Sequence, residues 1–310
     1  MERRIYDMIV IGGGPAGYTA ALYAARAGMS VLVLEKFSAG GQMTETMAID
    51  NYPGFDEGID GFTLGDRMRR GAERFGALTE QTEVLSADLL SSPKRIVTDA
   101  GERLGKTVVI ATGAVHRHLG LAGEEELVGR GVAYCAVCDG MFYRQKTVAV
   151  VGGGNSAAAD ALFLSGICKK VYVIHRRDSL RATKIYHEPL MRAENVEFLW
   201  DSRVSEILHG ERVSGVTVEN VKTGEREALA VEGLFVSIGR APATSLFADQ
   251  LLLDGAGYIV ADESTKTSVA GVFAVGDVRT KEVRQIVTAA ADGAVAVHHA
   301  EAYLLEHSDV

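Results

Sequence analysis

The stretch YDMIVIGGGPAGYTAALYAARAGMSVLVLEK, residues Tyr6–Lys36, decides the fold. A short apolar run ends in glycines, an alanine-rich segment follows, and a second apolar run closes the stretch, which predicts a strand, a tight turn, a helix and a second strand. In such a unit the first glycine makes the turn, the second lets the backbone approach a pyrophosphate, and the third lets the helix pack on the strand. The residues concerned are Gly12, Gly14, Pro15, Ala16 and Gly17.

The same unit occurs a second time, as KTVAVVGGGNSAAADALFLSGICKKVYVIHR, residues Lys146–Arg176. At a constant offset of 140, Gly12 falls on Gly152, Gly14 on Gly154 and Gly17 on Ala157. One glycine pattern is weak evidence, because such turns also occur without ligands. Two patterns in register, each followed by an apolar run of strand length, predict two dinucleotide-binding modules with a pyrophosphate at each helix N-terminus.

The residue at the end of the second strand indicates which dinucleotide each module prefers. In the first copy it is Glu35, a carboxylate that can accept hydrogen bonds from ribose hydroxyls, as FAD or NAD requires. In the second copy it is His175, followed by Arg176, Arg177 and Arg181, and these guanidiniums suit a 2'-phosphate. We therefore expect NADP in the second module, although a solvated basic turn is an alternative.

A flavin in one module and a nicotinamide in the other would give the pair a common purpose, because a hydride can pass between stacked rings. Two loops in the first module, AGGQM (39–43) and DNYPGF (50–55), suit a close approach of backbone to ligand. Near the end of the chain, GVFAVGDV (271–278) reads as an apolar strand that ends at Gly276 and Asp277, where a carboxylate can receive a hydroxyl.

The expected fold class is α/β, with two Rossmann-like dinucleotide-binding domains, for FAD and for NADPH, the second inserted in the first. The runs TVVIATGA (107–114) and LFVSIGRAP (234–242) end alike and are the expected crossovers. The FAD domain would comprise 1–115 and 246–310, closed by a C-terminal helix, and the NADPH domain 116–245.

Composition excludes several classes of protein. A formal net charge of -9 over 310 residues argues against non-specific nucleic-acid binding. Residues 8–25 carry no charge, but GGGPAG interrupts them, so a membrane span is not expected. Three cysteines are too few for a secreted disulfide framework, and we expect a cytoplasmic protein.

The sequence VAYCAVCDGMF, residues 132–142, puts Cys135 and Cys138 three apart. Zinc needs four ligands, and the only other cysteine, Cys168, is expected to be a small buried packing residue, so we predict no metal site. A structural disulfide over so short a loop would remove little chain entropy. A redox pair is favoured, because a helix beginning there would lower a thiol pKa.

Asp139 follows the pair directly. A turn or helix-terminal aspartate is the ordinary interpretation of this residue. Beside a dithiol that gains and loses protons, a carboxyl of raised pKa could instead act as acid and base, which is our hypothesis.

Several of these motifs, taken in order, resemble bacterial-type NADPH thioredoxin reductases of low molecular weight. They are GGGPAG, GGQM, CAVCDG, VGGGNSA, HRRDSLRA and GVFAVGDV...RQ. The resemblance implies a homodimeric FAD enzyme that passes electrons from NADPH through flavin to the cysteine pair and then to thioredoxin. It also implies that the NADPH domain rotates.

The resemblance assigns roles to residues. Cys138 would face the flavin, Cys135 would attack the partner disulfide, and Asp139 would donate a proton. It implies FAD contacts at the GGGPAG loop, Glu35, Gln42, Asn51, Asp277, Arg284, Gln285 and Ile286, and NADPH contacts at Gly154, Asn155, Ser156, His175, Arg176, Arg177, Arg181 and Arg240. Val137 stands where the family usually has threonine, and residues between the cysteines can shift the reduction potential of a dithiol without changing its chemistry.

Other functions compete with this one. The same flavin and dithiol could serve another donor, such as ferredoxin, or another redox-protein acceptor. A flavin-binding redox sensor is a different class, but the sequence contains no DNA-binding element or basic run to support it.

Overall fold

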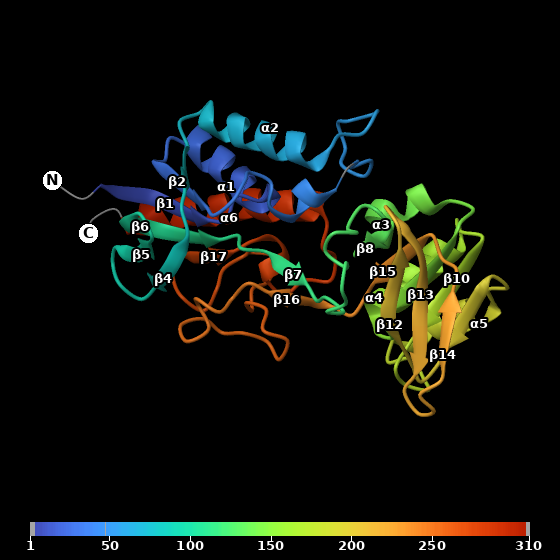
Figure 1. Cartoon of the computed structure of the whole chain (residues 1–310). Coiled ribbons are helices and arrows are strands. Elements are labelled where there is room, and N and C mark those ends of the chain that lie inside the picture. The colour runs from blue at the N-terminus through green and yellow to red at the C-terminus, as the bar shows by residue number, and fades with distance from the viewer. Residues whose placement is uncertain (1–3, 47, 308–310) are drawn as a thin grey trace. The chain divides into compact units, whose positions relative to one another are not determined.

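The computed structural model describes residues 4–46 and 48–307, so the outermost three residues at each end of the predicted FAD domain lie outside it. The chain divides into two compact units (Figure 1). Unit 1 comprises Met1–Val115 and Ala241–Val310, and unit 2 comprises His116–Arg240. Unit 2 is thus an insertion in unit 1.

Unit 1 is built on a seven-stranded sheet. In sheet order the strands are β3 (Leu78–Gln81), β2 (Val31–Glu35), β1 (Ile5–Ile11), β6 (Gly101–Ile110), β5 (Lys94–Thr98) and β4 (Val84–Asp88), and β17 (Val272–Ala274) also pairs with β6. The pairs between β3, β2, β1, β6 and β17 are parallel, whereas β4 and β5 extend the sheet antiparallel. This is a Rossmann-like strand order, in which ligands bind beyond the carboxyl ends of the parallel strands.

The two faces of this sheet have separate cores. Alternate residues of β1 point to opposite faces, so Met8 and Val10 join one buried cluster while Ile9 and Ile11 join the other. Helices α1 (Pro15–Arg26), α2 (Gly61–Glu73) and α6 (Ile286–Glu306) lie together along one face (Figure 1), and residues from the segment 247–278 pack on the other. The predicted C-terminal helix is α6.

Unit 2 has a five-stranded sheet that is parallel throughout. Its strands are, in order, β11 (Val196–Leu199), β10 (Lys170–Ile174), β9 (Thr147–Val151), β15 (Gly233–Val236) and β8 (Val132–Ala133). Helices α3 (Ala136–Asp139), α4 (Asn155–Ser165) and α5 (His187–Arg192) contribute to the core on one face. The antiparallel meander β12 (Ser202–His209), β13 (Val213–Asn220) and β14 (Arg226–Leu229) covers the other.

The sequence repeat is also a structural repeat. The order β3-β2-β1-β6 in unit 1 matches β11-β10-β9-β15 in unit 2, with α1 and α4 in equivalent positions. The remaining helical turns are short, namely η1 (Gly41–Glu45), η2 (Gly140–Tyr143), η3 (Lys184–Tyr186) and η4 (Gly276–Val278).

The chain passes between the units in two short strands that pair with each other, β7 (Ala114–His116) and β16 (Arg240–Pro242). They follow β6 and β15, the two runs expected to be crossovers. The structural division falls after Arg240, five residues before the boundary expected from sequence, because Ala243 hydrogen bonds to Gly113 and Thr112 in unit 1.

Candidate functional site

The glycine turn of unit 1 leaves the N-terminus of α1 open. Gly12 has a φ of +104°, and a Cβ there would meet the Ala111 carbonyl oxygen at 2.5 Å. A Cβ on Gly17 would collide with the Gly12 carbonyl, so this glycine lets the helix pack close. Gly14 caps α1 without any side-chain bond, and a Cβ on it would meet nothing within 4 Å. Pro15 at the first helical position and buried Ala16 complete the turn.

The turn of unit 2 repeats this geometry. Gly152 has a φ of +145° and abuts the Ser237 carbonyl, as Gly12 abuts Ala111. Gly154 caps α4 without a side-chain bond and faces open space. The backbone N–H of Thr183 donates to Asn155 Oδ1 at 2.8 Å, so Asn155 ties the segment after β10 to the turn, and Ser156 is exposed beside it.

Glu35 ends β2 next to the first turn. Its Oε2 accepts the Gly13 N–H at 2.5 Å, and its Oε1 accepts the Phe37 N–H at 3.0 Å. The carboxylate is therefore held beside the glycine turn, where the ribose of a bound dinucleotide would lie.

The equivalent position in unit 2 is basic. His175 is buried against Gly153, and its Nε2 has no hydrogen-bond partner in the described part of the chain. Burial lowers the pKa of His175, and the charges of three arginines lower it further. Those arginines, Arg176, Arg177 and Arg181, are exposed, and their side chains make no hydrogen bond or ion pair to any described residue.

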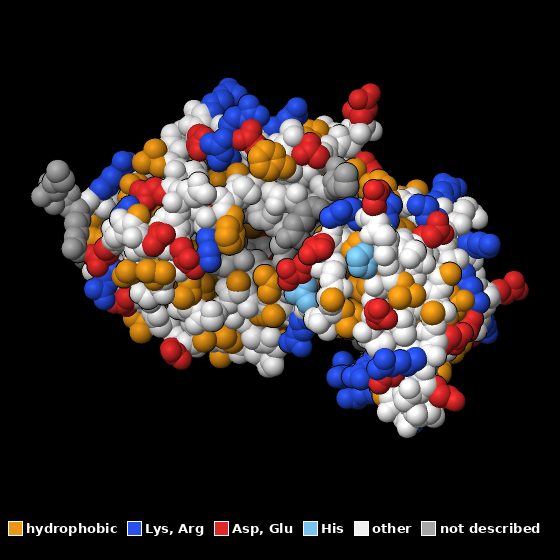
Figure 2. Space-filling view, in the orientation of Figure 1, with side chains coloured by type: hydrophobic (Ala, Val, Ile, Leu, Met, Phe, Trp, Pro, Cys, Tyr) orange, Lys and Arg blue, Asp and Glu red, His pale blue; other side chains and the backbone are white. Residues whose placement is uncertain are grey.

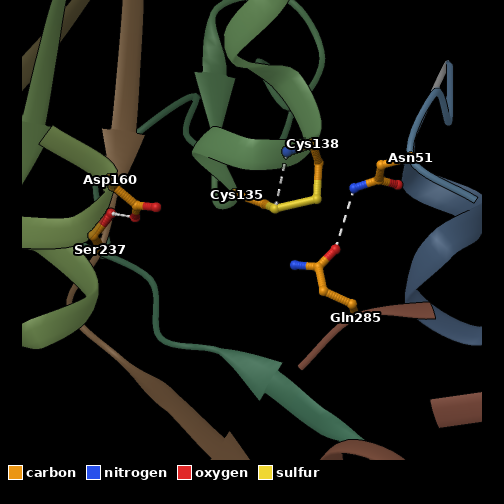
Figure 3. The surroundings of a disulfide bond; sticks show 6 residues. All are labelled: Asn51, Cys135, Cys138, Asp160, Ser237 and Gln285. Carbon is orange, nitrogen blue, oxygen red and sulfur yellow. Dashed lines mark hydrogen bonds between the residues drawn. A yellow bond between two sulfur atoms is a disulfide. The ribbon is translucent and has the colours of Figure 1, made fainter. Parts of the chain in front are cut away.

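The other residues expected at the flavin also lie in unit 1. Gln42, in η1, donates its Nε2 hydrogen to the Ala114 carbonyl. Asn51 Nδ2 donates to Gln285 Oε1 at 3.2 Å (Figure 3). Gln285 caps α6 in a reciprocal capping box with Thr288, so the Asn51 loop and the start of α6 are joined.

The segment before α6 holds the remaining predicted flavin contacts. Gly276 has a φ of +72°, and Asp277 follows it in η4 as a partly buried residue. The Arg284 guanidinium lies over the Tyr258 ring at 4.2 Å, and its buried Nε has no partner among the described residues. Ile286 begins α6 and packs against the cluster formed by Met43, Ile49 and Leu64.

The cysteine pair lies in unit 2 and forms a disulfide (Figure 3). Cys135 is the N-cap of α3, and its Sγ accepts the Cys138 backbone N–H at 3.2 Å. A helix thus begins at the pair, the arrangement on which the redox interpretation relied. Between the cysteines, Ala136 is buried and Val137 is half exposed, so the pair has an apolar, accessible side.

Asp139 ends α3 immediately after the pair and is partly buried. Burial raises the pKa of its carboxyl to about 6. A carboxyl in that range can hold or release a proton near neutral pH, as an acid-base group requires. Its role in chemistry stays a hypothesis.

Cys168 is buried and free, as predicted, and burial raises the pKa of its thiol to about 11. Within residues 4–46 and 48–307, no group of three or more His, Cys, Asp and Glu side chains is placed to hold a metal ion.

Arg240 begins β16. Burial lowers the pKa of His116 to about 4, and the charges of Arg240 and His118 contribute to this shift.

Comparison with known proteins agrees with this geometry. Residues 6–293 match the family model of the pyridine nucleotide-disulphide oxidoreductases. A thioredoxin reductase from Listeria monocytogenes is 44% identical over 98% of this chain and 96% of its own, and one from Streptomyces coelicolor is 46% identical over the same shares. The crystal structure of thioredoxin reductase from Streptococcus pyogenes, 45% identical, superimposes with a TM-score of 0.90 over 97% of this chain and 99% of its own.

The chain belongs to the thioredoxin reductase family. It is therefore a flavin-dependent disulfide oxidoreductase, and the resemblance and the fold class expected from the sequence are confirmed. A flavin and a pyridine nucleotide are the cofactors of thioredoxin reductases. The residues present fit them, because each unit offers an uncapped helix N-terminus facing open space, and the buried Nε–H of Arg284 has no partner among the residues that the structure describes.

Two observations bear on binding to nucleic acid and membranes. On the face seen in Figure 2, positive and negative side chains of the described residues are interspersed, without a continuous basic area. No helix in the described part of the chain combines the length and apolarity needed to cross a bilayer.

Sequence reasoning missed two polar clusters. Asp160 on α4 accepts a hydrogen bond from Ser237 Oγ at 2.6 Å. In unit 1, Arg279 and Asp292 form a buried ion pair. Each contains a lone acidic residue in an otherwise small and apolar stretch, AAADALFLS and TAAADGAVA, and that isolation was the available signal.

Proposed function

We propose that this enzyme transfers electrons from NADPH through FAD to the Cys135–Cys138 disulfide, and from the resulting dithiol to a thioredoxin disulfide. One observation carries the proposal: the disulfide caps α3 directly before Asp139, in the unit that also holds the basic nucleotide turn. Thioredoxin is proposed because relatives 44–46% identical are named thioredoxin reductase.

The choice of NADPH over NADH rests on the end of β10. No carboxylate stands there to bind a ribose 2'-hydroxyl, and Arg176, Arg177 and Arg181 offer exposed guanidiniums without partners in the described chain. Guanidinium groups bind phosphate through paired hydrogen bonds. Gly154, Asn155 and Ser156 would receive the pyrophosphate at the start of α4, and Arg240 would be a further NADPH contact.

FAD is proposed for unit 1. The loop from Gly12 to Gly17 would hold its pyrophosphate, and Glu35 its ribose. The Gly276–Asp277 turn, Gln42, Asn51 and the segment Arg284–Ile286 would contact the rest of the cofactor. Together the bound flavin and nicotinamide supply transfer of an electron pair, which this chain's side chains cannot provide.

The cysteine chemistry is thiol–disulfide exchange. Once the pair is reduced, the Cys135 thiolate attacks one sulfur of the partner disulfide, and a mixed disulfide forms as the other partner sulfur leaves. Asp139 donates the proton that neutralises this leaving thiolate. Cys138, as thiolate, then attacks Cys135 Sγ, which restores the intramolecular disulfide and releases the reduced partner.

We also propose that the enzyme acts in the cytoplasm and as a homodimer, following the sequence-based expectation. In that compartment the cysteine pair would be reduced by the enzyme's own electron transfer and reoxidised by exchange with thioredoxin, so no dedicated oxidant is needed. Light scattering coupled to gel filtration tests the dimer, and a monomer at micromolar concentration would contradict it.

Stopped-flow mixing tests the proposal as a whole. NADPH should bleach the flavin absorbance rapidly, and adding thioredoxin should restore it with turnover. Cys135→Ser and Cys138→Ser should retain flavin bleaching but lose thioredoxin reduction. A flavin that stays oxidised with NADPH but is reduced by ferredoxin would overturn the donor, and a panel of thioredoxin-like proteins would test the acceptor. Reduction without turnover of any acceptor would favour a sensor.

A further inference from the structure

Asp160 is the only charged residue of α4. The helix is otherwise lined by small and apolar side chains, of which Ala157, Ala158, Ala161 and Leu164 are buried. Asp160 is partly buried where α4 packs against α3, the short helix that begins at Cys135. A carboxylate in such a place is costly unless it has hydrogen-bond partners.

One hydroxyl donor holds this carboxyl. Ser237, just after β15, donates its hydroxyl to Asp160 Oδ2 at 2.6 Å. The backbone N–H of Ala136, at the start of α3, also acts on the Asp160 carboxyl and lowers its pKa. Figure 3 shows the Asp160–Ser237 pair with the carboxyl directed to the turn that carries Cys135. The carboxyl is thereby fixed between the end of β15 and the start of α3.

The charges around Asp160 are few. Burial raises the pKa of its carboxyl, while Ser237, the Ala136 N–H and the charge of Arg240 act in the opposite direction. Asp139 on α3 is the other carboxyl near the pair. On the other elements packed against α4, His187 bonds to the Ala182 carbonyl, Lys170 pairs with Glu197 and Glu188 pairs with Arg192. Lys184 on η3 is exposed.

The position of Asp160 bears on the sulfur chemistry. Free N–H groups at the start of a helix stabilise a thiolate at its N-cap, and a nearby negative charge destabilises it. Here the Cys138 N–H reaches Cys135 Sγ, while the Asp160 carboxyl acts on the next residue, Ala136, where α4 packs against α3. The start of α3 therefore faces a negative charge that opposes a Cys135 thiolate.

We propose that Asp160, held by Ser237, is a positioning residue that places a negative charge beside the start of α3 and makes the Cys135 thiolate harder to form. Destabilising the thiolate destabilises the reduced pair, so the dithiol becomes a stronger reductant. That direction suits an enzyme that must pass electrons outward. The benefit of a stronger reductant rests on the proposed function, whereas the alkylation experiment does not depend on it.

The test measures alkylation of Cys135 by iodoacetamide as a function of pH. It uses the flavin-loaded enzyme carrying Cys138→Ser, so that Cys135 is the only accessible thiol, with the labelled peptide identified by mass spectrometry. Adding Asp160→Asn should lower the pH midpoint of Cys135 alkylation by about one unit. At a pH below both midpoints, alkylation should then be about tenfold faster than in the parent. Asp160→Glu, which keeps the charge, should move the midpoint back toward that of the parent.

The matched control is Asp249→Asn, which removes one exposed carboxylate from unit 1 and should leave the midpoint unchanged. Flavin absorbance and circular dichroism confirm the fold of each variant. A folded Asp160→Asn variant with an unchanged or raised midpoint overturns the proposal and leaves Asp160 a packing residue. Because alkylation needs neither NADPH nor thioredoxin, a failed donor or acceptor assignment would not alter this readout.

Discussion

Arg279 and Asp292 form a two-bond ion pair inside unit 1, with Nε 2.9 Å from Oδ2 and a terminal nitrogen 2.8 Å from Oδ1. Both side chains are almost fully buried. Asp292 Oδ2 also accepts the Lys281 ammonium and the Gly276 N–H, each at 2.8 Å. Burial alone would raise the pKa of Asp292, and the bonds from Arg279 and Lys281 hold it below its usual range.

Asp292→Ala should therefore remove the buried carboxylate partner of Arg279 and Lys281, leaving Arg279 with only the exposed Glu263, and release the Gly276 turn. Breaking a buried pair costs about 3–5 kcal/mol, which corresponds to a fall in Tm of roughly 10 °C for a unit of this size. Differential scanning fluorimetry, with flavin fluorescence as a second signal, measures both unfolding and cofactor release. As a control, Asp66→Ala removes a surface pair on α2 and should cost under about 1 kcal/mol. Equal losses in the two variants would contradict this prediction.

The raised pKa of Asp139 predicts how stability depends on pH. Its pKa is about 6 in the folded enzyme and near 3.8 when unfolded, so the folded state binds the proton more tightly. The associated stability is present below about pH 4 and is lost as pH rises to about 6. Asp139→Asn should thus be more stable than the parent at pH 7.5, by up to about 3 kcal/mol, and similar at pH 4. Unfolding at both pH values tests this, and a difference equal at both would refute it.

The proton-donor role of Asp139 predicts a separate kinetic effect. Asp139→Asn cannot supply a proton to the leaving thiolate, and loss of a general acid typically costs 10²–10⁴-fold in rate. Turnover with thioredoxin should fall by roughly that factor, while reduction of the flavin by NADPH is unaffected. Unchanged thioredoxin turnover would remove Asp139 from the mechanism.

The two glycines of the second turn should behave differently on substitution. Gly154→Ala meets no atom within 4 Å and has an ordinary φ of −92°, so the protein should fold normally. Its methyl group would nevertheless stand where the pyrophosphate approaches, and we expect KM for NADPH to rise about tenfold or more, which is about 1.4 kcal/mol. Gly152→Ala, with a φ of +145°, should instead destabilise the fold. Normal NADPH affinity in Gly154→Ala would contradict the assigned site.

Arg177→Ala should change the choice of nucleotide. Each hydrogen bond from a guanidinium to a phosphate contributes about 1.5–3 kcal/mol, so kcat/KM for NADPH should fall about 10–100-fold. The value for NADH, which lacks the 2'-phosphate, should change little. Steady-state kinetics measure kcat/KM for both nucleotides. Arg192→Ala, on the exposed side of α5, is the control. A parallel loss for both nucleotides would mean that Arg177 does not select the phosphate.

The parts of the fold that were predictable depend on local signals. Apolar runs, alanine-rich segments and the glycines between them predicted β1-α1-β2 and β9-α4-β10, because each unit is specified within about 30 residues. The meander β12–β14 was not predicted, since its register depends on pairing between strands and on the sheet it covers.

The candidate site likewise contains residues that local sequence predicts and contacts that it does not. The cysteine pair at the start of α3 and the exposed arginines after β10 followed from adjacent residues. The bond between Asp160 and Ser237 joins residues 77 apart in sequence, and that between Asn51 and Gln285 joins residues 234 apart. Such contacts require the strand order of the assembled units, which no local pattern encodes; Asn51 and Gln285 were found only through family resemblance.

The pairing of β7 with β16 has a consequence for how this protein can be taken apart. The chain leaves unit 1 at Val115 and returns at Ala241, through two strands that lie side by side. Excising the intervening module and closing the gap with a few residues would leave the seven-stranded ladder uninterrupted. A fold of this kind can gain, lose or exchange its second nucleotide module in a single genetic event, and a recombinant fragment 116–240 is a natural unit for separate expression.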